Sequence, residues 1–244
     1  MNVISIGDSI AAGIGDQPID GRVDAWGGRL ARVLDGGRAV NLAVPGARMG
    51  MIRSTQVPAA VIAGPSLVLM SAGGNDIVDR RFAVTSFADG LQRCLAAITA
   101  SQASIVLLTV PDLAGAWPMP GRLRRTFRAR IDAVNCLIRE SAASHGAVVI
   151  DWEEHLHLRE ADCLHPDRVH LSPLGYERLA GLTRQLLGLP DPTKGHGAPS
   201  FQQQPARSLS MRDVVPLVRK SPDIARLVMR GPQVADQEPK TTVR

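Results

Sequence analysis

Three short segments of this chain carry the residue types that acyl transfer through a serine requires. They are Gly7-Asp8-Ser9-Ile10, Gly73-Gly74-Asn75-Asp76 and Asp167-Arg168-Val169-His170. A serine hydroxyl is a poor nucleophile at neutral pH. The reaction therefore needs a histidine that takes the proton, a carboxylate that orients the histidine, and hydrogen-bond donors for the oxyanion. The three segments contain a candidate for each part.

Ser9 directly follows an apolar, β-prone run at residues 2–6. Open α/β sheets place their sites at the carboxyl ends of strands, so the hydroxyl is expected at such an end. Asp and Ser after a strand are also ordinary helix N-cap residues. The Gly-Asp-Ser match alone leaves both interpretations open.

Other common motifs are missing from the sequence. It has no Gly-x-Ser-x-Gly elbow, which argues against lipases whose nucleophile lies in the middle of the chain. It also has no Gly-x-Gly-x-x-Gly after the first strand and no P-loop, which argues against dinucleotide-binding and nucleotide-hydrolysing folds.

Asn75 follows a second apolar run, residues 67–72, which reads as a buried parallel strand. The two glycines before Asn75 allow a sharp turn, so its amide is expected to point into the same crevice as Ser9. A plain turn with an Asn or Asp cap is the alternative interpretation.

The third segment contains two pairs with Asp-x-x-His spacing, Asp162 with His165 and Asp167 with His170. On an irregular loop this spacing lets the carboxylate fold back onto Nδ1 of the ring. That contact fixes the tautomer and leaves Nε2 facing the serine. The spacing by itself does not choose between the two pairs.

The order and separation of the three segments resemble those of the SGNH hydrolases, also called the GDSL esterase and lipase family. The resemblance covers residues 1 to about 188. It implies a carboxylic ester hydrolase of the esterase or lipase type that uses no metal and no cofactor. The partner that it implies is a small-molecule ester substrate.

The resemblance also chooses between the two histidines. In the family, the catalytic histidine is followed by a serine two residues on and a glycine five residues on. His170 meets this pattern and His165 does not. The resemblance therefore implies that Ser9 is the nucleophile, His170 the base and Asp167 the carboxylate that orients the base.

The family's oxyanion hole maps onto three positions of this chain. The resemblance assigns the backbone N–H of Ser9, the side chain of Asn75 and the backbone N–H of Gly46. A glycine suits the last position because a side chain would hinder the approach of its N–H to the substrate oxygen. The alternative for Gly46 is a plain Pro-Gly turn.

The rest of residues 1–188 predicts an α/β domain. Strands are expected at about 2–6, 38–43, 67–72, 104–110 and 147–151, and helices near 23–35, 50–63, 84–101, 121–144 and 173–188. Strands that alternate with helices imply a parallel sheet covered on both faces. We expect a flavodoxin-like three-layer fold whose five-stranded parallel sheet has the order 2-1-3-4-5. Right-handed crossovers would bring Ser9, Gly46 and Asn75 together.

Two loops are candidates for the walls of the crevice. Residues 111–121 follow the fourth strand with an apolar, proline-stiffened stretch, and residues 79–82 follow the Asn75 segment. Either loop is equally consistent with a surface connection, since loops at strand ends carry function only some of the time.

The composition changes at about Leu189. Residues 189–205 are rich in Pro, Gly and Gln, as in a flexible linker, and residues 211–229 are typical of a short basic amphipathic helix. We therefore expect an SGNH hydrolase domain at 1–188 and a linker with a basic tail at 189–244. The tail holds nine Lys and Arg against five Asp and Glu, so it carries most of the chain's net charge of +5.

A basic amphipathic tail has three interpretations: docking on its own domain, binding a protein partner, or weak binding to an anionic membrane surface. Nucleic-acid binding is not expected. Aromatic residues make up only 3% of the chain, and no helix-turn-helix or zinc-ligand spacing occurs.

The start of the chain favours a cytoplasmic location. Core sequence begins almost at Met1, without the charged and apolar regions of a signal peptide, and no stretch is long and apolar enough to span a bilayer. The three cysteines form no Cys-x-x-Cys motif.

Two alternatives to a general esterase remain. An O-acetyl deacetylase acting on a carbohydrate or glycan would use the same residues with a different pocket. A binding module could keep the fold without turnover, because fold does not fix function.

Overall fold

Five parallel strands form one sheet at the centre of the protein, in the order β2-β1-β3-β4-β5. The computed structural model describes residues 1–16, 25–34, 37–116 and 120–189. The predicted linker and basic helix at 190–244, and three residues of the predicted loop 111–121, lie outside these ranges. The strands are β1 (Asn2–Gly7), β2 (Arg38–Asn41), β3 (Leu67–Ser71), β4 (Ser104–Leu108) and β5 (Val148–Ile150). The predicted strand order is confirmed.

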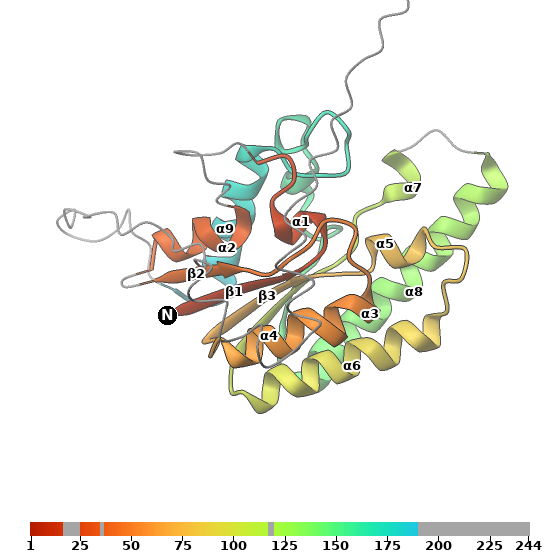
Figure 1. Ribbon diagram of the computed structural model, residues 1–244. Coiled ribbons are helices and arrows are strands. Elements are labelled where there is room, and N and C mark those ends of the chain that lie inside the picture. The colour runs from red at the N-terminus through yellow and green to blue at the C-terminus, as the bar shows by residue number, and fades with distance from the viewer. Residues whose placement is uncertain (17–24, 35–36, 117–119, 190–244) are drawn as a thin grey trace, which may run out of the picture.

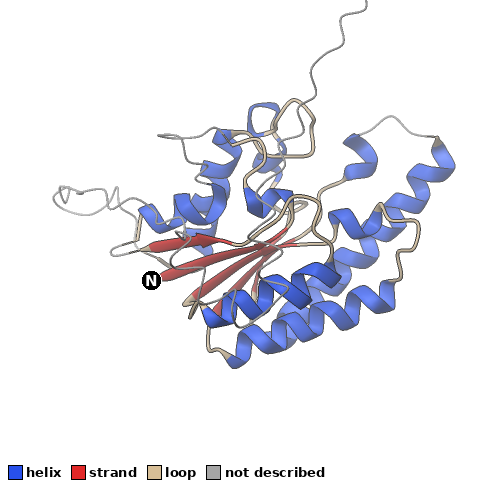
Figure 2. Ribbon diagram, viewed as in Figure 1, coloured by secondary structure: helices blue, strands red, loops and turns tan. Residues whose placement is uncertain are grey.

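Side chains alternate between the two faces of the sheet, and each face is covered by helices (Figures 1 and 2). Ile4 of β1 points to one face with Val68 and Met70 of β3, and packs with side chains of α6 (Val84–Ala100) and α8 (Gly121–His145). Val3 points to the other face and packs with side chains of α2 (Ala25–Arg32) and α9 (Pro173–Leu186). Helices on both faces confirm the three-layer prediction. Parallel strands that are apolar on both sides need such cover to be shielded from water.

The remaining helical elements of the described residues are short. They are α1 (Ser9–Ala12), α3 (Met49–Met51), the π-helical turn η1 (Ile52–Gln56), α4 (Val57–Ile62), α5 (Gly74–Ile77), α7 (Leu113–Ala116) and the 3₁₀ turns η2 (Leu156–Arg159) and η3 (Ala161–Cys163). The sequence predicted one helix at 50–63 and a loop at 111–121. In the first range α3, η1 and α4 follow one another without a break, so the predicted helix is present with a π-helical segment in its middle. In the second range the structure has α7. A helix of four residues is too short to show a hydrophobic period.

The close contact of β1 with β3 determines where the first strand ends. Gly7 pairs with Ser71 and has φ +123°, and a Cβ added to Gly7 would lie 1.9 Å from the carbonyl oxygen of Ser71. Only glycine fits this position. The chain then enters α1 directly, so Ser9 lies at the carboxyl edge of the sheet.

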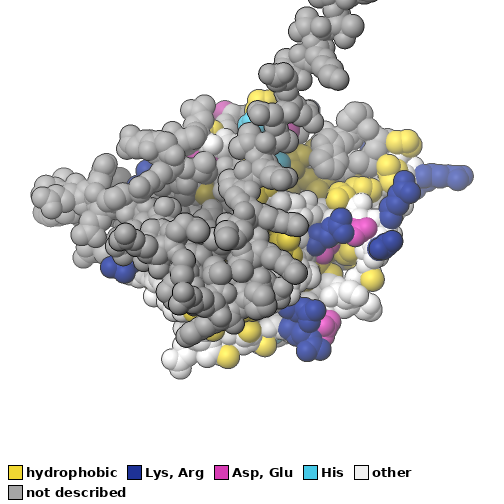
Figure 3. All heavy atoms as spheres, viewed as in Figure 1, with side chains coloured by type: hydrophobic (Ala, Val, Ile, Leu, Met, Phe, Trp, Pro, Cys, Tyr) yellow, Lys and Arg dark blue, Asp and Glu magenta, His cyan; other side chains and the backbone are white. Residues whose placement is uncertain are grey.

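The surface of the described region carries charges of both signs. Arg48 pairs with Asp79 and Arg93 with Asp89. Figure 3 shows dark blue and magenta side chains interspersed on the face that it presents, without a continuous basic surface among the coloured residues. None of the described helices is long and apolar enough to cross a membrane.

Candidate active site

Ser9 is the first residue of α1, and its hydroxyl contacts a histidine from the other end of the domain. The Nε2 atom of His170 lies 2.8 Å from Oγ of Ser9. Asp8, not Ser9, caps the helix, because Oδ1 of Asp8 accepts a hydrogen bond from the N–H of Ile10 at 3.1 Å. The Ser9 hydroxyl is therefore not used as a helix cap.

Asp167 lies on the opposite side of the His170 ring. Its Oδ2 is 2.7 Å from Nδ1 of His170, while its Oδ1 accepts the backbone N–H groups of Val169 and His170 at 2.9 and 3.0 Å. Arg168 between them has φ +61°, which folds the segment back on itself. The chain of contacts thus runs from Asp167 through His170 to Ser9.

The hydrogen bonds at Asp167 keep its carboxylate ionised. Partial burial acts to raise the pKa of Asp167, but the N–H and the imidazole of His170 and the N–H of Val169 outweigh it. The pKa of Asp167 therefore lies well below its usual range. An ionised carboxylate at this place stabilises a positive charge on the His170 ring.

The other Asp-x-x-His pair does not form. Among the described residues, no hydrogen bond or ion pair joins His165 to Asp162 or to Ser9. Instead, Nδ1 of His165 lies 3.0 Å from Oδ2 of Asp167, and Asp162 lies 3.8 Å from the guanidinium of Arg178.

Asn75 lies in α5, and the structure brings it to the loop that contains Gly46. Its Nδ2 donates a hydrogen bond to the carbonyl oxygen of Ala47 at 3.1 Å. Gly46 has φ +81°, and a Cβ added to it would meet no atom within 4 Å. The backbone conformation, rather than crowding by the protein, therefore favours glycine there.

Ser9, Asn75 and His170 line one cavity of about 160 Å³. Its apolar wall is formed by Val78, Val110, Pro111, Leu113 and Val169. The loop after β4 thus contributes Pro111 and Leu113, as the sequence suggested for residues 111–121.

Residues 79–82 do not line this cavity. Asp79, Arg81 and Phe82 lie instead on a separate hollow of about 470 Å³ between the loop after α5 and the surfaces of η1 and α6. The expectation that residues 79–82 wall the crevice around Ser9 is therefore wrong. The turn of α5 directs the chain away from Ser9 after Val78.

Sequence reasoning missed a buried contact directly beneath the nucleophile. Oγ of Ser71 donates to Oδ1 of Asp8 at 2.6 Å and accepts the N–H of Ala11 at 3.1 Å. Burial raises the pKa of Asp8 to about 6, although the bonds from Ser71 and Ile10 oppose that shift. The polar Ser71 at the end of an otherwise apolar strand was the available signal.

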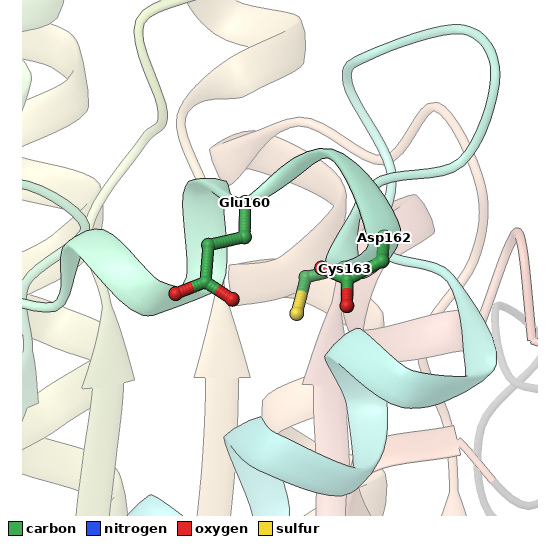
Figure 4. A group of neighbouring side chains, drawn as sticks. All are labelled: Glu160, Asp162 and Cys163. Carbon is green, nitrogen blue, oxygen red and sulfur yellow. The ribbon is translucent and has the colours of Figure 1, made fainter.

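A group of possible metal ligands lies beside the site, at η3. The ligand atoms of Glu160, Asp162 and Cys163 lie within 4.8 Å of one another (Figure 4). Arg178 forms ion pairs with both carboxylates, and burial raises the pKa of the Cys163 thiol. The thiol is neutral and both carboxylates are paired with Arg178. The group is therefore a salt-bridge cluster and not a metal-binding site.

Residues 5–178 match the family model of the GDSL-like lipase/acylhydrolase family. The chain belongs to this family of hydrolases, which confirms the resemblance inferred from the sequence. Among proteins with curated descriptions, none matches the chain.

Solved structures share the fold. A lipase/acylhydrolase from Enterococcus faecalis is 23% identical, with a TM-score of 0.59 over 77% of this chain and 96% of the other. A catalytic mutant of the acetylxylan esterase Axe2 from Geobacillus stearothermophilus is 18% identical, with a TM-score of 0.61 over 78% and 94%. TesA is 22% identical, with a TM-score of 0.59 over 77% and 98%.

Proposed function

We propose that this protein is a serine-dependent carboxylic ester hydrolase. The observation that carries the proposal is the continuous line of contacts from Asp167 to His170 and from His170 to Ser9, with distances of 2.7 and 2.8 Å, at the wall of a cavity. A nucleophile, a base and an orienting carboxylate in this order are the parts that acyl transfer requires.

The first half of the reaction forms an acyl-enzyme. With its Nδ1–H donated to the ionised Asp167, the neutral His170 ring offers the lone pair of Nε2 to the Ser9 hydroxyl. His170 takes the proton as Oγ of Ser9 bonds to the ester carbonyl carbon. The same proton then goes to the leaving alcohol as the ester C–O bond breaks.

The negative charge that develops on the carbonyl oxygen needs donors already in place. We assign the backbone N–H of Ser9, the backbone N–H of Gly46 and the side-chain amide of Asn75. The N–H of Ser9 begins α1 and has no partner within that helix. One N–H of the Asn75 amide bonds Ala47, and the second has no partner among the described residues, so we assign it to the substrate oxygen.

The second half releases the acid. A water molecule gives one proton to Nε2 of His170 while its oxygen attacks the acyl carbon, and that proton returns to Oγ of Ser9 when the acyl–serine bond breaks. Asp167 remains ionised throughout and holds the ring in place.

The cavity favours a short acyl group. Its volume of about 160 Å³ is well below the roughly 300–1,000 Å³ of pockets for drug-sized ligands. This small volume also favours a second candidate function, the removal of acetyl groups from a carbohydrate. The structural likeness to an acetylxylan esterase is consistent with this narrower function.

Hydrolysis of nitrophenyl esters from acetyl upward, measured beside acetylated sugars, tests both candidates. Highest kcat/KM on acetyl or propionyl esters is expected, with a fall on longer chains. Activity confined to acetyl groups and higher on acetylated sugars would identify a deacetylase. A protein that hydrolyses no ester and is not labelled at Ser9 by a fluorophosphonate would be a binding module, and the proposal would be wrong.

A further inference from the structure

Gln56 contacts the backbone of β1 two residues before Ser9. Its side chain is fully buried, with an exposed fraction of 0%. Oε1 of Gln56 accepts the N–H of Gly7 at 2.5 Å, and Nε2 donates to the carbonyl oxygen of Gly7 at 3.0 Å. One side-chain amide thus satisfies both polar groups of one backbone residue.

These bonds replace a strand partner that is missing. β2 runs beside β1 only as far as the pair Ser5 and Asn41. Beyond that pair, the edge of β1 that faced β2 would leave the N–H of Gly7 buried and without a partner, which proteins rarely tolerate. Gln56 therefore extends the hydrogen bonding of the sheet by one more residue, up to the start of Asp8-Ser9.

The same contact reaches the loop that carries Gly46. The carbonyl oxygen of Gly7 also accepts the N–H of Val44 at 3.1 Å. Gly7 is therefore held by Gln56 from one element and by Val44 from another. Both the path of the chain into Ser9 and the start of the loop 44–47 depend on where this carbonyl lies.

Gln56 reaches Gly7 from the last position of a π-helical turn, η1. Such wide turns are rare in proteins and occur frequently at functional sites. The turn lies between α3 and α4, and it places a polar, fully buried side chain against the end of the nucleophile strand.

We propose that Gln56 is a positioning residue that fixes Ser9 and the Gly46 loop relative to each other, and this role rests on the function proposed above. A donor and an acceptor on one planar group are both needed, because Gly7 presents one N–H and one carbonyl. Leucine supplies neither group. Glutamic acid supplies both when it is protonated and only acceptors when it is ionised.

Two substitutions at this position test the proposal. Gln56→Leu should lower kcat by roughly ten- to a hundred-fold, the cost of a small misplacement of reacting groups, and change KM far less. Gln56→Glu should approach the wild-type rate at acid pH and lose activity as pH rises, because an ionised carboxylate repels the Gly7 carbonyl. Activities are compared with wild type at each pH, which removes the pH dependence of the wild-type reaction from the ratio.

Gln92, an exposed glutamine of α6, provides a control for substitution away from the site. Its Nε2 donates to Oγ of Ser141 at 2.9 Å, so it joins α6 to α8 without contacting the site. Gln92→Leu and Gln92→Glu should keep wild-type kcat and show a ratio to wild type that does not depend on pH. All variants are assayed at a temperature at which circular dichroism shows them folded.

Backbone NMR separates failure of this inference from failure of the proposed function. Gln56→Leu, and not Gln92→Leu, should shift the amide signals of Ser9 and Gly46, a result that requires no turnover. If wild type hydrolyses no ester, these signals alone decide the role of Gln56. If Gln56→Leu does not fold, the pH dependence of Gln56→Glu decides it.

Three results would overturn the inference. The first is a folded Gln56→Leu variant with kcat within about twofold of wild type. The second is a Gln56→Glu variant whose activity relative to wild type is the same at all pH values. The third is unchanged amide signals at Ser9 and Gly46.

Discussion

His165 and Asp167 lie in direct contact, with Nδ1 of His165 3.0 Å from Oδ2 of Asp167. The same oxygen lies 2.7 Å from Nδ1 of His170. The histidines of the two Asp-x-x-His pairs therefore both contact the carboxylate of Asp167, and only His170 extends from it to Ser9.

This arrangement predicts unequal effects at the two histidines. His170→Ala should lose activity on the order of a million-fold, as expected for a member of a catalytic triad. His165→Ala should keep a large fraction of wild-type activity, because the remaining bonds to Asp167 still orient His170. Steady-state kinetics on both folded variants measure the difference. An inactive His165→Ala together with an active His170→Ala would reverse the assignment.

The pH dependence of the wild type follows from the same chemistry. Only a neutral imidazole can accept the Ser9 proton, so a protonated His170 cannot act as the base and kcat/KM should fall at acid pH. Asp167, whose pKa lies below its usual range, adds no step between pH 4 and pH 8. A profile that is flat down to pH 4 would contradict a histidine base.

Ser9→Ala should remove nearly all turnover and leave the fold intact. The hydroxyl contacts His170 at the cavity wall, while Asp8 caps α1 and keeps the helix in place. The loss should again be on the order of a million-fold. Retention of more than a few per cent of activity, in protein shown to be folded by circular dichroism, would refute Ser9 as the nucleophile.

Asn75→Ala should lower kcat by roughly a hundred- to a thousand-fold, the usual cost of one preorganised oxyanion donor. KM should change far less, because the donor acts on charge that develops in the transition state. Steady-state kinetics that give kcat and KM separately measure this difference. A raised KM with unchanged kcat would assign Asn75 to substrate binding instead.

Asp8→Asn should change how stability depends on pH. The folded state raises the pKa of Asp8 from 3.8 to about 6, so between these values the unfolded chain releases a proton that the folded protein keeps. Stability therefore falls as pH rises through this window, by about 3 kcal/mol for a shift of about two units. Asparagine does not titrate. The free energy of unfolding in urea should therefore fall less between pH 4 and pH 7 for Asp8→Asn than for wild type. Equal falls in the two proteins would show that another group causes the pH dependence.

Gly7→Ala tests the close contact between β1 and β3. The new Cβ would lie 1.9 Å from the Ser71 carbonyl oxygen at a residue with φ +123°, so roughly 2–6 kcal/mol of stability should be lost through strain and overpacking. Gly64→Ala is the control. It has φ +66° with no atom within 4 Å of the new Cβ, and should cost only about 1–2 kcal/mol. If thermal unfolding showed the same loss of stability for both variants, the backbone at Ser71 would have to move away from the new Cβ at little energetic cost.

The sequence by itself determined the strands, their order in the sheet and the longer helices. These features follow from local hydrophobic patterns and from the handedness of crossovers, which act on every chain in the same way. Ser9 could be placed at the end of a strand because the apolar run before it stops at Gly7.

Tertiary structure decided which side chains meet around that strand end. Gln56 and Gly7 are 49 residues apart in the sequence, and Asp8 and Ser71 are 63 residues apart. No local sequence pattern therefore predicts either contact. The four-residue turn of α5 turns residues 79–82 away from Ser9, and the fold of the loop at Arg168 brings both histidines to Asp167. Such contacts depend on the exact direction of a side chain after several elements have packed, and hydrophobic periodicity carries no information about that direction.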